Sequence, residues 1–517
     1  MRKGKRFLIN ALILSVSSFV MRTIGVSFNV YISNQLGAAG VGLFQLIMSV
    51  YLFAVTLATS GIALATTRLV AEELAAGISA GVKSAVRRCL CYAIFFGMLS
   101  SIFLFAFADP IGSVLLQDTR CVRSLKILSV SLPFIAMSAV LSGYFTAVRR
   151  IIKSASAQIF EQFVKIGTCV IGLKFLLPGG IEYACIAVVG GGCIAETLSF
   201  FFQLTLYLFD RRRYRGGRKA ISSNRFMTQK MFRIALPVAF SSYARSALTT
   251  AEHILIPPRL RMFGYSKEEA LARYGVVHGM VLPILFFPSA ILTAFSGLLV
   301  PEMAEYHVHG GKKQIHYVMS QVLHAALIFA IGVSGIFFMY SNELGLVIYQ
   351  SQEAGMYLKI FSPLVIVMYI DGVVDGMLKG LNEQVSSMRY NVIDSLVSVL
   401  MVYFLIPICG IGGYVAVIYV SESLNGFLSL NRLICVTDYK IDYKKWIVKP
   451  CAAILMSSFA VRYGMEIFGI SLGGTAKGVT FGICCTAVLY LVLLVFSSCI
   501  SRSDVEQVSM LFWTKNG

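Results

Sequence analysis

Four polar residues stand on one face of a helix predicted at residues 155–177. The spacing of Gln158, Glu161, Gln162 and Lys165 is i, i+3, i+4 and i+7, which places all four on one side over two helical turns. We interpret this face as part of a binding site for an anionic headgroup. The alternative is structural, because Glu161 and Lys165 can neutralise each other against neighbouring helices.

Two arginines extend this interpretation to other helices. Arg22 follows the segment SSFVM inside the predicted first helix, 8–33, and Arg245 lies inside the predicted seventh helix, 232–256. An arginine within an apolar, span-length helix is costly unless it faces protein or water, so by default it marks a functional site. If both helices converge with the helix of Lys165, the three basic side chains line a cavity that suits a phosphate or pyrophosphate group.

A second polar face is predicted in the helix at 357–378 and just after it. Asp371, Asp375 and Lys379 stand at i, i+4 and i+8, and a glycine follows each of them. The two aspartates, like Glu161, are candidate ion-coupling residues. They are equally well explained as structural counter-charges to Lys379. The glycines favour a close-packing surface over a hinge.

These residues belong to a chain that is mostly apolar. Of its 517 residues, 57% are hydrophobic and 14% are charged, which is too little polar surface for a soluble protein of this length. Long apolar runs alternate with short polar breaks. The sequence therefore predicts an all-α polytopic membrane protein with about fourteen transmembrane helices, each near the roughly 20 residues that a span requires.

The distribution of the 45 Lys and Arg residues supports this count. Most of them fall in alternate loops on the side where the N-terminus begins, as the positive-inside rule requires of cytoplasmic loops. We therefore expect a multi-pass membrane protein with both termini in the cytoplasm. The net charge of +20 then lies near anionic lipid, so nucleic-acid binding is a poor explanation for it.

Motifs typical of enzymes and metal sites give no support to either class. The sequence has no GxxxxGK[ST] segment for nucleotide hydrolysis, and no HExxH or GxSxG with supporting residues. The 12 cysteines show no paired spacing in the predicted outer loops and are best explained as small packing residues. We expect a secondary transporter and no enzyme, with no metal and no cofactor.

The longest polar break, at 210–230, falls near the middle of the predicted spans. A shift of the sequence by 224 places Ser17 and Ser18 on Ser241 and Ser242, which indicates two parallel six-helix repeats. The predicted domains are an N-terminal lobe at 1–209, a basic cytoplasmic linker at 210–230, a C-terminal lobe at 231–435, and two further helices with a cytoplasmic tail at 436–517.

Four segments carry a family resemblance. They are the pattern RxxxxNxxxLSxSSFxxRxxG from Arg6 to Gly25, GAAGVGLFQL at 37–46, SGIALATTRLVAEE at 60–73 and SAQIFEQFVKIG at 156–167. The chain thereby resembles the stage V sporulation protein B and polysaccharide-export family of the multidrug, oligosaccharidyl-lipid and polysaccharide flippase superfamily. The resemblance implies two six-helix lobes around a central cavity, in which Arg22 contacts a pyrophosphate. The sequence departs from precursor flippases in having no Asp after the Arg-xx-Gly motif.

We therefore predict an alternating-access flippase of a lipid-linked oligosaccharide or peptidoglycan precursor, in cell-wall or spore-cortex synthesis. Its partners would be a polyprenyl-pyrophosphate-linked glycan, the lipid bilayer and cell-wall synthesis enzymes. Two alternatives stay open. A cation-coupled multidrug exporter of the same fold would have an acidic, aromatic cavity. A non-transporting membrane scaffold for wall-synthesis enzymes would depend on the linker at 210–230 and not on Arg22.

Overall fold

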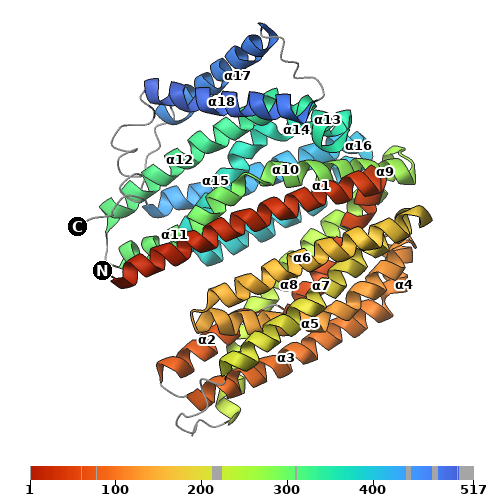
Figure 1. Cartoon of the computed structure of the whole chain (residues 1–517), viewed down its shortest axis with the longest axis vertical. Coiled ribbons are helices and arrows are strands. Elements are labelled where there is room, and N and C mark those ends of the chain that lie inside the picture. Colours follow the sequence, from red (N-terminus) through yellow and green to blue (C-terminus); the bar gives the residue numbers. More distant parts are fainter. Residues whose placement is uncertain are drawn as a thin grey trace. The chain divides into compact units, whose positions relative to one another are not determined.

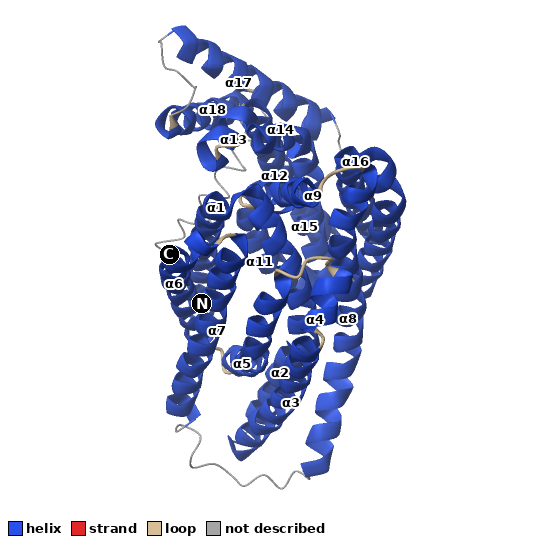
Figure 2. Ribbon diagram, turned by 90° about the vertical axis from the view of Figure 1, so that its right-hand side faces the viewer, coloured by secondary structure: helices blue, strands red, loops and turns tan. Residues whose placement is uncertain are grey.

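A computed structural model describes residues 2–59, 61–76, 79–211, 224–308, 311–437, 444–467, 475–497 and 499. Nearly all of them are helical, and this part of the chain contains no β-strand (Figure 1, Figure 2). The predicted all-α membrane class is confirmed. Nine helices within the described ranges are long and apolar enough to cross a membrane, and a total of fourteen stays a prediction. Most of the predicted linker, at 212–223, and the tail at 500–517 lie outside the described residues.

The chain forms two compact units that alternate along the sequence. The first comprises residues 1–275 and 395–417, and the second comprises 276–394 and 418–517. The first unit contains α1 (Arg2–Thr59), α2 (Ile62–Ala75), α3 (Ser79–Ala106), α4 (Ala108–Pro110), α5 (Cys121–Ala147), α6 (Ile151–Leu176), α7 (Ile181–Asp210), α8 (Asn224–Phe263) and α9 (Lys267–Tyr274). The predicted lobe boundaries stay a prediction.

The second unit contains the later helices. They are α10 (Leu282–Phe286), α11 (Ser289–Val308), α12 (Lys312–Met339), α13 (Ser341–Tyr349), α14 (Gln352–Phe361), α15 (Val365–Gly380), α17 (Lys449–Ile467) and α18 (Ala476–Phe496). The long helix α16 (Gln384–Thr437) contributes to both units. Short π-helical segments occur at Ile111–Leu115, Gly275–Val281 and Lys444–Val448.

A glycine divides each of the two longest helices. Gly37 in α1 has φ of 68° and Gly410 in α16 has φ of 57°, a left-handed conformation that glycine adopts without steric cost. Each glycine therefore separates two spans within a helix of 58 or 54 residues. Both lie in the short breaks that the sequence predicts between neighbouring spans, at 34–40 and 408–410.

The core of the first unit lies between α2, α3, α5 and α7, and the start of α8 joins it. Figure 1 shows α3, α5, α6 and α7 side by side. Tyr144 and Phe145 are fully buried in this core. A small residue permits the closest approach, because a Cβ on Gly143 would lie 2.6 Å from the Ala63 carbonyl oxygen. Such contacts hold helices together in lipid, where apolar burial gives little preference for the helix interface.

Ion pairs hold one end of the first unit together. Asp210, the last residue of α7, is 1% exposed and pairs with Arg150 and with Lys153, whose Nζ lies 2.9 Å away. Glu72 of α2 pairs with Lys230 of α8 at 2.5 Å. All five residues come from segments predicted at or beside cytoplasmic loops. These contacts therefore agree with the predicted alternation of cytoplasmic and outer loops along the chain. Which end faces the cytoplasm stays a prediction.

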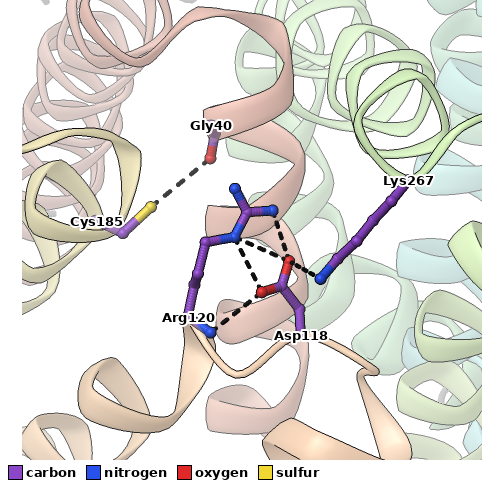
Figure 3. A network of polar contacts seen from close by, with 5 residues as sticks. All are labelled: Gly40, Asp118, Arg120, Cys185 and Lys267. Atoms are coloured by element: carbon purple, nitrogen blue, oxygen red, sulfur yellow. Dashed lines mark hydrogen bonds and ion pairs between the residues drawn. The ribbon is translucent and has the colours of Figure 1, made fainter.

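Asp118 organises the other end of the first unit (Figure 3). Its side chain is 2% exposed, Arg120 Nη2 lies 2.7 Å from Oδ2, and Lys267 Nζ lies 3.3 Å from the same oxygen. Burial alone would raise the pKa of Asp118, but the hydrogen bonds and charge of Arg120, with the charge of Lys267, hold this pKa below its usual value. One buried carboxylate thus connects the start of α5 with the start of α9.

The short helix α9 packs tightly on the bend of α1. A Cβ on Gly42 would lie 2.0 Å from the Leu271 carbonyl oxygen, and one on Gly275 would lie 2.2 Å from that of Ala38. Any larger side chain at either glycine forces the two backbones apart. Residues that follow the predicted linker are therefore an integral part of the first unit.

The second unit has its core between α11, α12, α15 and the end of α16, with Met303, Met319 and Met377 fully buried. Helices α17 and α18 attach to α12. The Tyr490 hydroxyl of α18 donates to the Ile328 carbonyl oxygen at 2.9 Å. The two C-terminal helices, predicted to lie outside the six-helix lobes, are thus joined to the second unit through α12.

Replacing Asp118 by Asn should destabilise the protein. The variant keeps the shape of the side chain but leaves Arg120 and Lys267 without a carboxylate. Because these cations are 26% and 42% exposed, the cost is that of lost charge-assisted hydrogen bonds, about 1.5–3 kcal/mol, and not that of a fully buried charge. We expect a lower midpoint of thermal unfolding in detergent. The matched control is Asp109→Asn, since Asp109 is 67% exposed and its pair with Lys126 contributes at most about 1 kcal/mol. Equal midpoints for the two variants would contradict the role assigned to Asp118.

The lowered pKa of Asp118 also predicts the sign of a pH dependence. Because the folded pKa lies below the unfolded value of about 3.9, the contribution of Asp118 to stability is present above about pH 4. It is lost as the pH falls through the folded pKa. The difference in free energy of unfolding between the wild type and Asp118→Asn should therefore shrink on acidification, and a difference that grows would refute this assignment.

Candidate functional site

The polar face of α6 lies against the first part of α1. Gln158 is exposed on this face, and the other three polar residues are half-buried. A Cβ on Gly25 of α1 would lie 3.8 Å from Nε2 of Gln162. Gly25 and Arg22 are three residues apart, so they share one side of their helix. The structure therefore brings the Arg22 side of α1 to the predicted face of α6.

The side chain of Arg22 is exposed, although its helix is apolar enough to cross the membrane. Packing between helices does not cover this charge. An exposed guanidinium within a membrane span requires water or an anionic ligand nearby. Arg22 thus has the accessibility that the predicted headgroup site requires.

Arg245 lies on α8 and is also exposed. Next to it, Ser246 Oγ donates to Thr56 Oγ1 at 3.2 Å, and Thr250 Oγ1 donates to the Ser49 carbonyl oxygen at 3.1 Å. These contacts attach α8 to the part of α1 that follows Gly37, whereas the α6 face lies against the part that precedes it. A single cavity shared by Arg22, Lys165 and Arg245 stays a prediction.

Lys165 extends along α6 toward α7. Its Cε lies 3.9 Å from the position of a Cβ on Gly192, and its charge acts on Glu161. Glu161 also lies within reach of the Ser199 hydroxyl of α7. This proximity is compatible with both interpretations of Glu161 and Lys165, a structural ion pair and an anion site. In the first, Glu161 neutralises the ammonium of Lys165. In the second, Glu161 competes with a bound anion for the same ammonium.

Glu196 of α7 is a half-buried carboxylate that the sequence analysis did not assign to the site. Its Oε2 lies 2.7 Å from the Tyr51 hydroxyl, which in turn lies 2.6 Å from Ser131 Oγ. The charges of Glu161 and Lys165 act on it. These partners come from α1, α5 and α6, and no helical spacing connects them. The one signal in the sequence is a glutamate at the centre of an apolar stretch, residues 183–209, that contains no other charged residue.

The aspartates of α15 have partners within the second unit. Asp375 Oδ2 lies 2.5 Å from Lys379 Nζ, and Asp375 Oδ1 accepts a hydrogen bond from Ser387. Asp371 Oδ2 accepts a hydrogen bond from Asn425 Nδ2 at 3.0 Å. Asp375 therefore acts as a counter-charge to Lys379 in this structure. An ion-coupling role for Asp371 and Asp375 stays a prediction.

The glycines of the same helix differ in their surroundings. A Cβ on Gly376 would lie 1.8 Å from Ser296 Oγ, and one on Gly380 would lie 2.9 Å from the Val300 carbonyl oxygen, so both allow α11 to approach closely. A Cβ on Gly372 would meet no atom within 4 Å. The predicted close-packing surface is thus formed by two of the three glycines.

Comparison with known proteins shows which proteins this chain resembles. Residues 7–262 match the polysaccharide biosynthesis protein family. Stage V sporulation protein B of Bacillus subtilis (strain 168) is 27% identical over 522 residues, which cover 98% of each chain. Lipid II flippase MurJ of the same organism is 21% identical over 501 residues, which cover 90% of each chain. These relatives match the chain almost from end to end.

Two solved structures share the fold. Lipid II flippase MurJ in an inward closed conformation aligns with a TM-score of 0.70 over 94% of this chain and 98% of its own, at 13% identity. A multidrug resistance MATE family transporter of the MOP superfamily, in an inward-facing conformation, gives 0.59 over 83% of this chain and 100% of its own, also at 13% identity. The chain is thus a multi-pass membrane protein with the fold of these transporters. The resemblance predicted from the opening helices is confirmed by the match of residues 7–262 to the polysaccharide biosynthesis protein family and by the similarity to stage V sporulation protein B and MurJ.

Proposed function

We propose that this protein is a flippase for a lipid-linked oligosaccharide or peptidoglycan precursor. The observation that supports the proposal most directly is the exposed Arg22, on the side of α1 that lies against the polar face of α6. The similarity to MurJ, named a lipid II flippase, and to stage V sporulation protein B supports the same class of substrate. A role in cell-wall or spore-cortex synthesis follows from that class.

The residues of this surface match the chemistry of a glycosyl diphosphate. The planar guanidinium of Arg22 can bind two phosphate oxygens at once, and the ammonium of Lys165 supplies a second, more compact charge. The amides of Gln158 and Gln162 can donate to and accept from sugar hydroxyls. Glu161 keeps Lys165 near this surface when no anion is bound. Arg245 would be the sixth residue of this site, as predicted from the sequence.

Translocation would proceed by alternating access. The headgroup enters from the cytoplasmic side and binds the basic surface, while the polyprenyl tail stays in lipid between helices. Rocking of the two lobes then exposes the headgroup to the outside. In this proposal the protein works in the bacterial plasma membrane with both termini in the cytoplasm. Cell-wall synthesis enzymes would deliver the glycan on one side and consume it on the other.

The two alternatives receive less support. A cation-coupled multidrug exporter shares the fold, but it requires an acidic, aromatic surface, whereas the exposed residues Arg22 of α1 and Arg245 of α8 are basic. A scaffold for wall-synthesis enzymes does not require an exposed arginine in an apolar helix. Both alternatives therefore leave Arg22 unexplained.

Replacing Arg22 by Ala should lower translocation of a fluorescent polyprenyl-pyrophosphate sugar in liposomes about tenfold to a hundredfold, because hydrogen bonds between charged groups contribute about 1.5–3 kcal/mol. Lys165→Ala should fall in the same range, and Arg22→Lys should be intermediate because it keeps the charge and loses the bidentate geometry. Arg68→Ala is the control, as Arg68 is 64% exposed and pairs with Glu72. Normal flipping by both Arg22→Ala and Lys165→Ala, at equal protein level, would rule the proposal out.

Competition distinguishes the flippase from the drug exporter. Inorganic pyrophosphate should inhibit translocation of the labelled lipid, since it carries the charges that Arg22 and Lys165 recognise. The organic cation ethidium should not inhibit. The reverse pattern, inhibition by ethidium alone, would favour the exporter.

Arg245→Ala tests whether α8 contributes to the same site. If it does, the inhibition constant of inorganic pyrophosphate should rise about tenfold, the equivalent of about 1.4 kcal/mol. The control is again Arg68→Ala. An unchanged inhibition constant in Arg245→Ala would remove Arg245 from the site and leave Arg22 and Lys165 in it.

A further inference from the structure

A series of three polar contacts connects α7, α1 and α5 inside the first unit. Glu196 Oε2 lies 2.7 Å from the Tyr51 hydroxyl, Tyr51 lies 2.6 Å from Ser131 Oγ, and Ser131 lies 2.9 Å from the Leu128 carbonyl oxygen. Tyr51 is 3% exposed and Ser131 is fully buried. Both hydroxyls must therefore find their hydrogen-bond partners within the protein.

The number of protons in this series depends on Glu196. Three contacts need three protons, and the hydroxyls of Tyr51 and Ser131 supply two. If Ser131 donates to Leu128 and Tyr51 donates to Ser131, the remaining contact needs a proton on Glu196. If Glu196 is ionised, the Tyr51 hydroxyl donates to its carboxylate. The Ser131 hydroxyl then donates to Tyr51 or to the carboxylate. No proton is left for a hydrogen bond to the Leu128 carbonyl oxygen. All three contacts are hydrogen bonds only when Glu196 is protonated.

The charges around Glu196 lead to the same number of protons. Glu161 and Lys165 face it from α6, Tyr51 faces it from α1, and Cys193 is the neighbouring titratable group on α7. Two carboxylates thus share one ammonium. The two carboxylates repel each other, and the charge of Lys165 can neutralise only one of them. With one proton, the group formed by Glu161, Glu196 and Lys165 has no net charge.

We propose that Glu196 is a proton-binding site that takes up and releases one proton in each transport cycle, an inference whose cycle rests on the proposed flippase function. On uptake, a hydronium ion transfers one proton to the carboxylate, which leaves a neutral carboxylic acid and one water molecule. Release is the reverse reaction, and no further reagent takes part. At each step the hydroxyls of Tyr51 and Ser131 change the acceptors to which they donate.

Lys165 connects this proton to the headgroup. With both carboxylates ionised, Lys165 is held between two negative charges. A proton on Glu196 removes one of them and makes the ammonium more accessible to a diphosphate. By linkage, a diphosphate bound near Lys165 must increase the affinity of the site for its proton by the same factor. Proton and headgroup therefore favour each other's binding.

The proton site can be tested without any substrate. Acid–base titration of the purified protein in detergent, between roughly pH 5 and pH 9, should show that Glu196→Gln binds about one proton fewer per chain than the wild type. Glutamine keeps the packing, because its amide can donate to Tyr51 as a carboxylic acid does. Glu182→Gln, on the same helix, is the matched control, since Glu182 pairs with Arg123 at 3.4 Å and should leave the count unchanged. Equal counts for Glu196→Gln and the wild type would overturn the proposal.

The coupling can be tested with farnesyl diphosphate as the anionic lipid. Its binding to the wild type, measured by calorimetry, should tighten as the pH falls, by at most about tenfold per pH unit for one linked proton. The ligand's own diphosphate titrates at about pH 6, so every variant keeps that contribution. Binding to Glu196→Gln should lose the additional tightening at low pH, whereas Glu182→Gln should behave as the wild type does. Tyr51→Phe retains the carboxylate and should keep a pH dependence with a shifted midpoint. A pH dependence that is the same in Glu196→Gln and the wild type would contradict the coupling.

The two tests separate this inference from the proposed function. If the missing proton is found but farnesyl diphosphate does not bind to the wild type, the proton site stands and the headgroup site is wrong. If farnesyl diphosphate binds through Arg22 and Lys165 while Glu196→Gln titrates as the wild type does, the headgroup site stands and the proton site is wrong.

Discussion

An ionised side chain within a membrane protein must reach water, a ligand or an opposite charge, and this constraint explains where the charges of the first unit lie. Arg22 satisfies it by exposure. Asp118 and Asp210 satisfy it by pairing, since each is almost completely buried between two basic side chains. Helix packing alone, through glycines such as Gly42 and Gly143, could not compensate for these charges.

The balance of charge differs between the ends and the middle of the first unit. At each end one carboxylate meets two cations, which fixes the ends of several helices in one arrangement. In the middle, two carboxylates, Glu161 and Glu196, interact with the same cation, Lys165. A carboxylate with surplus positive charge stays ionised, whereas a pair with too little can change its state at small energetic cost. The proposed proton site thus lies between two ends whose carboxylates are each paired with two cations.

Local patterns in the sequence predict part of this arrangement. The helical face of α6 follows from spacing alone, and Gly37 and Gly410 fall where the apolar runs break. The neighbours of that face could not be predicted, because Tyr51 and Glu196 are 145 residues apart and Asp118 and Lys267 lie on opposite sides of the predicted linker. Contacts of this kind depend on which helices pack together, and hydrophobic periodicity contains no information on that choice. The packing of α9 on α1 was likewise not predicted.

The participation of Lys267 at Asp118 has a consequence for the order of synthesis. The ribosome completes the first six predicted spans, which correspond to α1 to α7, before it reaches α8 and α9, so Asp118 first meets Arg120 without Lys267. At that stage α9 does not yet pack on the bend of α1, because Gly275, which contacts Gly42, has not been synthesised. Domains generally fold as their sequence emerges, from the N-terminus onward. Here the first unit requires α9, which is made after the linker, and residues 395–417 of α16, which are made later still. The unit therefore cannot be complete when only the N-terminal half of the chain has been synthesised.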